Sequence, residues 1–458
     1  MVFHERLPAA AVAARLRVPP DRLPPTGRWR GREAPPPGGR ATASDWRAMP
    51  SSPKPHWQDL FREVVETDTC SGCAACVVAC PRKVLGYRDT HPFQMDEPSG
   101  PADCRFGDLG CDACVRACHR FHLDTDVIEQ ERFGRPRAPE ELFGMVQQQL
   151  ALRATQPQVS SRGQDGGLVS ALLIWALETD RIDGAIVAGP VPGQPWRAQP
   201  TLVETPEQVL ACAGSYYTYS PNLLALAETA PDRRLALVSV PCQVSGVVKS
   251  QWRRLKRFRS VVLTVGLMCS ETFTETGFLD ELLHQRLELD LDQVRKVNVK
   301  GRVLVSTDQA DHGRLGRESV PGSRARLGEG GIIEIPLKEA RPTARPQCRW
   351  CPDFAAEWAD LSAGGLGLEG WTITLLRTET GREWVQELLA AGRVEAQPAE
   401  AFPSALAVLE RLSRIQRLRP ARRRAKLDPH VTTGFDGTSQ LRPVPPAPDP
   451  AAPAGEDG

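Results

Sequence analysis

Apolar residues in the middle of the chain form short runs that alternate between a strand pattern and a helix pattern. The strand-like runs are 184–189, 235–241, 260–268 and 370–378. The helix-like runs that follow the last three of them are 242–255, 274–287 and 382–392. This alternation is typical of parallel βαβ units, so the pattern predicts an α/β fold for this part of the chain.

The flanking regions complete the predicted organisation. Residues 139–155 have a helix-like pattern, and 295–300 and 331–337 have a strand-like pattern around a loop. Both ends of the chain are rich in Pro and lack periodic apolar positions, which is typical of disorder. The predicted domains are a disordered segment at 1–55, a small cysteine-rich module at 60–130 that we expect to be independent, an α/β (α+β) domain at 138–425 and a disordered tail at 428–458.

Composition and charge exclude several classes of protein. The 458 residues include 57 Lys and Arg and 56 Asp and Glu, so a net charge of +1 argues against a whole-protein nucleic-acid binder. No apolar run approaches the roughly 18 residues of a membrane span, and no compact secretory signal is present. We expect a cytoplasmic protein, in which the 13 cysteines indicate metal binding rather than disulfides.

The first cysteine motif, "CSGCAACVVACP", has the spacing of a bacterial ferredoxin. Its thiols are Cys70, Cys73, Cys76 and Cys80, separated by two, two and three residues and followed by Pro81. In this pattern three thiolates bind one 4Fe–4S cluster and the fourth binds a second cluster, which requires a second motif.

The second motif, "CRFGDLGCDACVRACH", supplies Cys104, Cys111, Cys114 and Cys118. It departs from the pattern twice, because six residues separate its first pair and His119 replaces the usual proline; Gly107 and Gly110 allow the longer loop to bend. The ferredoxin crossover predicts one cluster on Cys70, Cys73, Cys76 and Cys118, and another on Cys80, Cys104, Cys111 and Cys114. The alternative is a pair of zinc sites or structural thiols.

The remaining cysteines suggest a third site. Cys242 and Cys269 each follow a predicted strand, so both thiols would emerge at the carboxyl edge of a parallel sheet, where ligands bind in α/β folds. The pair Cys348 and Cys351 would complete four thiolates for a third 4Fe–4S cluster. We interpret Cys212, within a helix-like run, as a buried free thiol.

The main domain resembles the family of coenzyme F420 hydrogenase/dehydrogenase beta subunits. The resemblance is carried in order by "QDGGLVSALLIWALETDRIDGAIVAG", "SYYTYSPNLLAL", "VPCQVSG", "VGLMCSETF", "CRWCPDFAAEWADLSAGGLG" and "GWTITLLRT", and spans roughly 140–380. It implies that Cys242, Cys269, Cys348 and Cys351 ligate one 4Fe–4S cluster next to an FAD. Some family members carry a ferredoxin-like segment in front, as this chain does.

The family resemblance also points to flavin contacts. It favours FAD binding by the loop Gln164, Asp165, Gly166 and Gly167, whose glycines precede a helix and would let a phosphate approach its amides. The alternative is a tight turn with Asp165 as the helix N-cap. Tyr219 and Asn222, in a segment that also holds Tyr216 and Tyr217, would line the isoalloxazine or pack in the core. No side chain is assigned as a catalytic acid or base.

The expected function is an FAD- and iron–sulfur-dependent oxidoreductase that exchanges electrons with a hydride carrier, coenzyme F420 in the family. The alternatives are a ferredoxin-dependent reductase of a tetrapyrrole-like substrate, a non-catalytic electron-relay subunit and a zinc-stabilised scaffold. The basic run 411–426 is either a solvated helix face or a docking site for an acidic partner such as a ferredoxin. Asp353 and Asp360 are expected to orient the loop after "CRWC".

Overall fold

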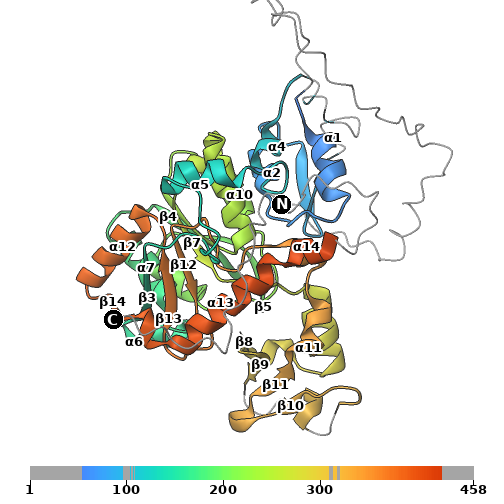
Figure 1. Cartoon of the computed structure of the whole chain (residues 1–458). Helices are drawn as coiled ribbons and strands as arrows, with labels where there is room; N and C mark the ends of the chain where they lie inside the picture. Colours follow the sequence, from blue (N-terminus) through green and yellow to red (C-terminus); the bar gives the residue numbers. More distant parts are fainter. Residues whose placement is uncertain are drawn as a thin grey trace, which may run out of the picture. The chain divides into compact units, whose positions relative to one another are not determined.

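The computed structural model describes residues 54–95, 104, 107, 109–308, 313–316 and 320–424 (Figure 1). The segments that we expect to be disordered, 1–55 and 428–458, lie outside the described residues except for 54 and 55. The basic run 411–426 is described as far as residue 424.

Residues 54–133, here called the front segment, hold short helices, one hairpin and both cysteine motifs. Its strands β1 (Leu85–Arg88) and β2 (His91–Gln94) pair antiparallel across a two-residue turn, in which Asp89 and Thr90 both have positive φ. Its helices are α1 (Trp57–Leu60), η4 (Phe61–Val65), α2 (Ala75–Ala79), α4 (Ala113–Ala117) and α5 (Thr125–Phe133). Helices α2 and α4, which carry cysteines of the two motifs, pack against each other.

The larger sheet has eight strands in the order β14-β3-β13-β12-β7-β6-β4-β5. Their bounds are β3 (Gln148–Ala154), β4 (Gly184–Val191), β5 (Gln194–Val203), β6 (Leu235–Ser239), β7 (Val261–Leu267), β12 (Leu361–Gly364), β13 (Thr372–Leu376) and β14 (Val394–Pro398). The central strands β4, β6, β7 and β12 are parallel neighbours, as the alternating pattern predicts. The outer strands pair antiparallel, so the sheet is mixed rather than parallel throughout.

One predicted element is wrong. Residues 139–155 do not form a helix: 148–154 form strand β3, and the residues before it form turns. The Gln, Leu, Ala and Arg residues of this strand favour a helix intrinsically, but β3 pairs with β13 on one side and β14 on the other. Two ladders of backbone hydrogen bonds and the burial of Ala151 and Leu152 outweigh the local preference.

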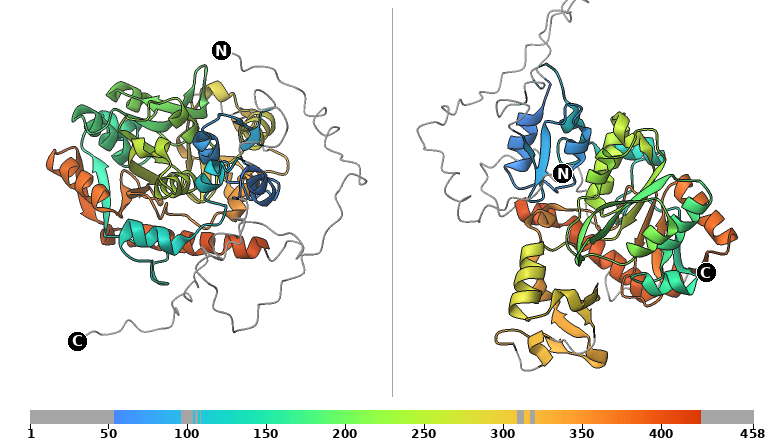
Figure 2. Two further views of the ribbon diagram at one scale, coloured as in Figure 1. Left: turned by 90° about the horizontal axis from the view of Figure 1, so that it is seen from above. Right: turned by 180° about the vertical axis from the view of Figure 1, so that it is seen from behind.

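Helices cover both faces of the large sheet (Figure 2). One face contacts α7 (Leu168–Glu178), α8 (Pro206–Ala211) and α12 (Glu379–Ala390), and the other contacts α9 (Leu223–Ala227), α10 (Pro241–Trp252) and α13 (Pro403–Arg417). Successive residues of β4 separate the faces, since Ala185 and Val187 pack with the first group and Ile186 with the second. Strands covered on both sides need an apolar residue at nearly every position.

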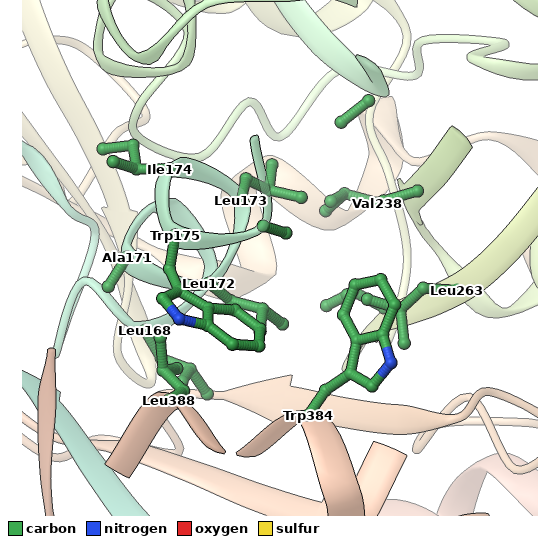
Figure 3. Packing of buried hydrophobic residues seen from close by; sticks show 14 of the residues in the cluster. Leu168, Ala171, Leu172, Leu173, Ile174, Trp175, Val238, Leu263, Trp384 and Leu388 are labelled. Carbon is green, nitrogen blue, oxygen red and sulfur yellow. The ribbon is translucent and has the colours of Figure 1, made fainter. Parts of the chain in front are cut away.

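Helix α7 is buried nearly all round, which explains its continuous apolar sequence (Figure 3). The ring centroids of Trp175 in α7 and Trp384 in α12 lie 6.2 Å apart, with the two rings edge to face. Leu172 is 0% exposed in the same cluster, so we expect its truncation to alanine to cost about 2–5 kcal/mol. None of the helices in the described part of the chain is both long and apolar enough to cross a membrane.

A second sheet has the order β10-β11-β9-β8 and its own hydrophobic cluster with η6 (Glu275–Arg286). Its strands are β8 (Val294–Val299), β9 (Arg302–Thr307), β10 (Arg326–Leu327) and β11 (Ile333–Pro336), so the predicted strands at 295–300 and 331–337 are confirmed. The remaining short elements are α6 (Pro157–Arg162), η5 (Lys256–Ser260), η7 (Leu291–Gln293), η8 (Gly313–Gly316), η9 (Glu329–Gly331), α11 (Leu337–Ala340), η10 (Arg341–Thr343), η11 (Pro346–Trp350), η12 (Ala399–Ala401) and α14 (Arg419–Arg424).

The front segment shares a hydrophobic core with the large sheet, which differs from the independent module that we expected. Ala75, Val78 and Ala117 belong to one buried cluster with Leu235 and Val247 of β6 and α10. The sequence pattern does not reveal this packing, because each segment carries enough apolar residues to read as a separate unit.

Candidate metal centres and cofactor loop

Four thiols gather at the carboxyl edge of the large sheet, and we call them the sheet-edge tetrad: Cys242, Cys269, Cys348 and Cys351. Strands β6 and β7 are parallel neighbours, so Cys242 in the first turn of α10 and Cys269 after β7 emerge at the same edge. The "CRWC" loop meets them there, since the Cys269 amide donates to the Phe354 carbonyl at 2.9 Å. All four cysteines line one pocket.

Electrostatics confirms that these thiols are neighbours. Burial raises the pKa of Cys242, and the nearby Cys351 and Cys348 raise it further. Burial also raises the pKa of Cys269 well above its usual value, with Cys348, Cys242 and Cys351 adding to the effect. Cys242 and Cys269 therefore favour the neutral thiol on their own, and a bound cation is what would favour their thiolate forms.

A second group, the inner tetrad, consists of Cys70, Cys73, Cys76 and Cys118. Burial, together with the nearby Cys118, raises the pKa of both Cys70 and Cys73 to about 12. Burial raises the pKa of Cys76 as well, and Cys118, Cys73 and Cys70 are its first neighbours. The motif loop is tight at Gly72, which has a φ of +71°.

The outer tetrad consists of Cys80, Cys104, Cys111 and Cys114. Burial is the main cause that raises the pKa of Cys114, and the nearby Cys111, Cys80 and Cys104 raise it further. These neighbours are one thiol of the first motif and two of the second; with Cys114 itself they form the grouping that the ferredoxin crossover predicts. That the three tetrads ligate clusters stays a prediction.

The state of the thiols and their spacing bear on which metal they could bind. All 13 cysteines are free thiols. Within the described residues, no three Cys, His, Asp or Glu side chains lie close enough together to hold a single metal ion. A zinc ion draws its ligands to about 2.3 Å from one centre, whereas each thiolate of a 4Fe–4S cube binds a different iron, so the ligands stand further apart.

Cys212 lies apart from the tetrads. It forms the C-cap of α8 and packs half-buried against the α7 cluster. Its described neighbours are Gly189, where an added Cβ would lie 2.9 Å from the sulfur, and Tyr216, whose pKa is raised by burial and by this thiol. The interpretation of Cys212 as a free thiol without a metal stays a prediction.

The loop before α7 packs closely against the backbone of β3 and against Thr372 of β13. An added Cβ on Gly166 would lie 2.5 Å from the Leu152 carbonyl, and the Gly166 amide donates to Thr372 Oγ1 at 3.1 Å. Asp165 is not the N-cap that the alternative interpretation assigned: the cap is Gly167, with φ of +72° and no side-chain hydrogen bond. The first-turn amides of the 11-residue helix α7 therefore have no capping side chain.

Two lysines from β8 and the turn after it reach this loop. Lys300 Nζ lies 3.9 Å from Asp165 Oδ1, and Lys296 Nζ donates to the Gln164 carbonyl at 3.3 Å. Burial raises the pKa of Asp165, while Lys300 and Lys296 oppose the shift. Backbone amides at a helix start and two ammonium groups make this loop suited to a phosphate group.

Tyr219 and Asn222 occupy other places. The Tyr219 hydroxyl lies 3.8 Å from the Cys242 sulfur, so this side chain belongs to the surroundings of the sheet-edge tetrad. Asn222 is buried and donates to the Val238 carbonyl at 2.9 Å, which ties its segment to β6. The Tyr217 hydroxyl accepts from the Val299 amide at 3.2 Å, and burial raises the pKa of Tyr217, with Asp165 and Cys269 raising it further.

Two aspartates after "CRWC" organise the backbone, as expected. Asp353 accepts a hydrogen bond from the Glu357 amide at 3.0 Å, and burial and the Glu357 charge raise the pKa of Asp353 to about 7. Asp360 accepts from the Thr264 amide at 2.8 Å and from Arg132 at 2.8 Å. Asp353 thus holds the loop together internally, and Asp360 ties it to β7 and α5.

Three buried cations near the thiols were not anticipated. Arg120, Lys249 and Arg345 are each 1–2% exposed. Lys249 Nζ donates to the Cys118 carbonyl at 2.6 Å, and burial lowers the pKa of Lys249 to about 8. The sequence offered one signal, which is that Arg120 and Arg345 lie within three residues of a motif cysteine.

Comparison with known proteins identifies the family. Family models for the N-terminal and C-terminal parts of the coenzyme F420 hydrogenase/dehydrogenase beta subunit match residues 150–227 and 232–401. The chain is 31% identical over 281 residues to the beta subunit of the coenzyme F420 hydrogenase of Methanothermobacter thermautotrophicus, covering 59% of this chain and 92% of that protein. It is 25% identical to a subunit of the F(420)H(2) dehydrogenase of Methanosarcina mazei, covering 70% of this chain and 83% of that protein.

The fold matches a solved relative. A chain of the F420-reducing [NiFe] hydrogenase complex from Methanosarcina barkeri superposes with a TM-score of 0.54 at 27% identity, covering 63% of this chain and 94% of that chain. Sequence and fold agree, and this chain belongs to the family of coenzyme F420 hydrogenase/dehydrogenase beta subunits.

Proposed function

We propose that this protein is an FAD- and iron–sulfur-dependent oxidoreductase that passes electrons between coenzyme F420 and 4Fe–4S clusters, and from there to a partner protein. The family membership supports the hydride carrier, since relatives of this chain are named as subunits of coenzyme F420 hydrogenase and of F(420)H(2) dehydrogenase. The twelve clustered thiols support the iron–sulfur part.

The observation that carries the proposal is a continuous series of candidate sites. The charges of Asp165 in the flavin loop and of Cys269 in the sheet-edge tetrad both act on Tyr217. Cys242 of that tetrad neighbours Cys73 of the inner tetrad. Cys76 of the inner tetrad in turn neighbours Cys114 of the outer tetrad. These neighbour relations support a path for electrons from the flavin loop through the sheet-edge and inner tetrads to the outer tetrad.

Each part of the series has a distinct chemical task. The amides of Gly167 and α7, with Lys296 and Lys300, would hold the FAD pyrophosphate. When bound, FAD supplies the exchange between two-electron hydride transfer and the one-electron chemistry of clusters. The protein contributes position and a buried, low-dielectric surrounding for the thiolates, and it holds the hydride donor and acceptor in contact.

The test is an anaerobic assay of the full, iron-reconstituted chain with FAD. We expect it to oxidise reduced coenzyme F420 with an artificial dye as acceptor, and to leave NADH and NADPH unused. Reduction by ferredoxin with no activity toward F420 would favour the tetrapyrrole-reductase alternative. A chain that binds iron and FAD but is inactive with every donor would favour a relay subunit, and a colourless protein with stoichiometric zinc would refute the proposal.

A further inference from the structure

Two buried arginines cross between the front segment and the "CRWC" region. Arg345, just before "CRWC", donates from both terminal nitrogens to the Ser71 carbonyl at 3.2 Å, inside the first cysteine motif. Arg120, just after the second motif, donates to the Trp350 carbonyl at 2.7 Å, inside "CRWC". Each arginine therefore binds the cysteine loop of the other segment.

Among the described residues, the groups that most favour the charged form of Arg345 are thiols and phenols. Its guanidinium lies 3.8 Å from the centre of the Tyr219 ring, and its Nε is buried with no hydrogen-bond partner among the described residues. The groups that raise its pKa against burial are Tyr219, Cys348, Tyr87 and Cys242. A buried cation without a carboxylate is costly unless another negative group compensates it.

The first motif is shaped to admit this arginine. A Cβ added to Gly72 would lie 2.7 Å from Arg345 Nη2 and 2.3 Å from the Thr90 carbonyl. The residue between Ser71 and Cys73 must therefore be glycine both for its positive φ and for the space that Arg345 occupies.

Both arginines line the pocket of the sheet-edge tetrad together with Ser71 of the first motif, so they lie at the junction of the two neighbouring tetrads. Arg345 lowers the pKa of Cys242 in the sheet-edge tetrad and of Cys70 in the inner tetrad. Arg120 lowers the pKa of Cys351 in the sheet-edge tetrad and of Cys118 and Cys70 in the inner tetrad. The charges that act most on Cys114 of the outer tetrad are those of Cys111, Cys80 and Cys104.

We propose that Arg120 and Arg345 form a shared cationic bridge between the sheet-edge and inner tetrads, which holds the two sites at one junction and raises the reduction potential of the cluster at each. The inference deepens the proposed function, on which it rests for the presence of the clusters.

The physical reason is electrostatic. Reduction of a cluster adds one negative charge, and a buried positive charge nearby stabilises the reduced form strongly, because the low-dielectric interior screens it weakly. Since one guanidinium lies near two sites, its removal should disfavour reduction at both. The outer tetrad should be unaffected and serves as an internal reference.

The test is a potentiometric titration of the full, reconstituted chain, followed by low-temperature spin resonance of the reduced clusters. Serine variants at Cys348, Cys118 and Cys111 assign the signals to the three tetrads. In Arg345→Gln we expect the sheet-edge and inner potentials to become more negative while the outer potential stays unchanged. Arg345→Lys keeps the charge and should retain most of the wild-type potentials.

Two further variants separate charge from folding. Arg120→Gln should shift the same two potentials from the other side of the junction. Arg197→Gln is the control, since the described partners of this arginine are the carboxylates Glu275 and Asp280 and include no tetrad thiol, so all three potentials should stay unchanged. Equal shifts of all three clusters, a shift at one tetrad only, or no shift would overturn the inference.

The outcomes also distinguish this inference from the proposed function. If wild-type protein holds three clusters but does not oxidise reduced F420, the potentials still test the bridge and only the assigned substrate fails. If wild-type protein binds no iron at the tetrads, both fail. If both Gln variants lose iron while Arg345→Lys retains it at shifted potentials, the arginines are structural anchors and the electrostatic role is wrong.

Discussion

Replacing Cys348 or Cys242 by serine should remove iron from the same site, although the two residues are far apart in the sequence. The structure places both in one pocket with Cys269 and Cys351. Three tetrads at four irons each give about 12 Fe per chain. A neutral hydroxyl holds iron far less well than a thiolate, so each variant should fall to about 8 Fe, with the inner and outer sites still occupied.

The assay is iron per chain after anaerobic reconstitution, together with the spin-resonance signal of the reduced protein. The matched control is Cys212→Ser, which changes a half-buried thiol at the end of α8 and should keep all of its iron. Equal iron loss in Cys348→Ser and Cys242→Ser, with one signal missing in both, is the expected result. If Cys348→Ser loses a cluster and Cys242→Ser keeps every iron, the sheet-edge tetrad is misassigned.

Other variants test the packing around the sites. Gly246→Leu should push Cys73 away from α10, because even a Cβ at this glycine would lie 3.3 Å from the Cys73 sulfur. We expect slower electron transfer from the flavin to the inner cluster at unchanged iron content, measured by stopped flow. Leu172→Ala should lower the free energy of unfolding by about 2–5 kcal/mol without loss of iron. A chain that begins at residue 140 should be less soluble than the full chain by sedimentation, since it exposes the core that the front segment covers. Burial alone would raise the pKa of Glu357, but two buried arginines hold it below its ordinary value. The ionised Glu357 therefore stabilises the fold at pH values above its unfolded pKa of about 4.3, and this stabilisation is lost as the pH falls through the lowered pKa of the folded protein. Glu357→Gln should lower the free energy of unfolding by about 3–5 kcal/mol at neutral pH. It should also make stability depend less on pH on the acid side of a denaturation curve.

The grouping of the cysteines was the part most open to prediction from sequence. Cysteine spacing fixes how many thiols a local loop can direct at one centre, and the ferredoxin spacing also indicates which thiol crosses to the other site. The prediction for Cys242 and Cys269 rested on a different argument. Each follows a strand, and the two strands proved to be parallel neighbours, so the thiols share an edge.

Strand β3 shows where local pattern fails. Its residues have good helix propensity, and the sequence of 148–154 alone does not predict pairing with β13 and β14, which lie more than 200 positions later in the chain. Pairing of that range depends on the whole sheet. The antiparallel outer strands of the sheet could not be predicted for the same reason. The alternating pattern predicts the parallel βαβ core but not the strands that pair outside it.

The buried cations explain why the front segment belongs to the main fold. A polar group that leaves water must find partners, and here the partners lie in the other segment: Lys249 of α10 meets the Cys118 carbonyl, and Arg345 meets the Ser71 carbonyl. Separation of the segments would leave these carbonyls and cations without each other and expose the apolar cluster between them. The contacts that join the segments are thus made by α10 and by the short loops that carry the inner and sheet-edge thiols. The two cysteine motifs in the sequence suggest a separate module, whereas the apolar cluster and the buried cations shared by the segments require the two sites to form together.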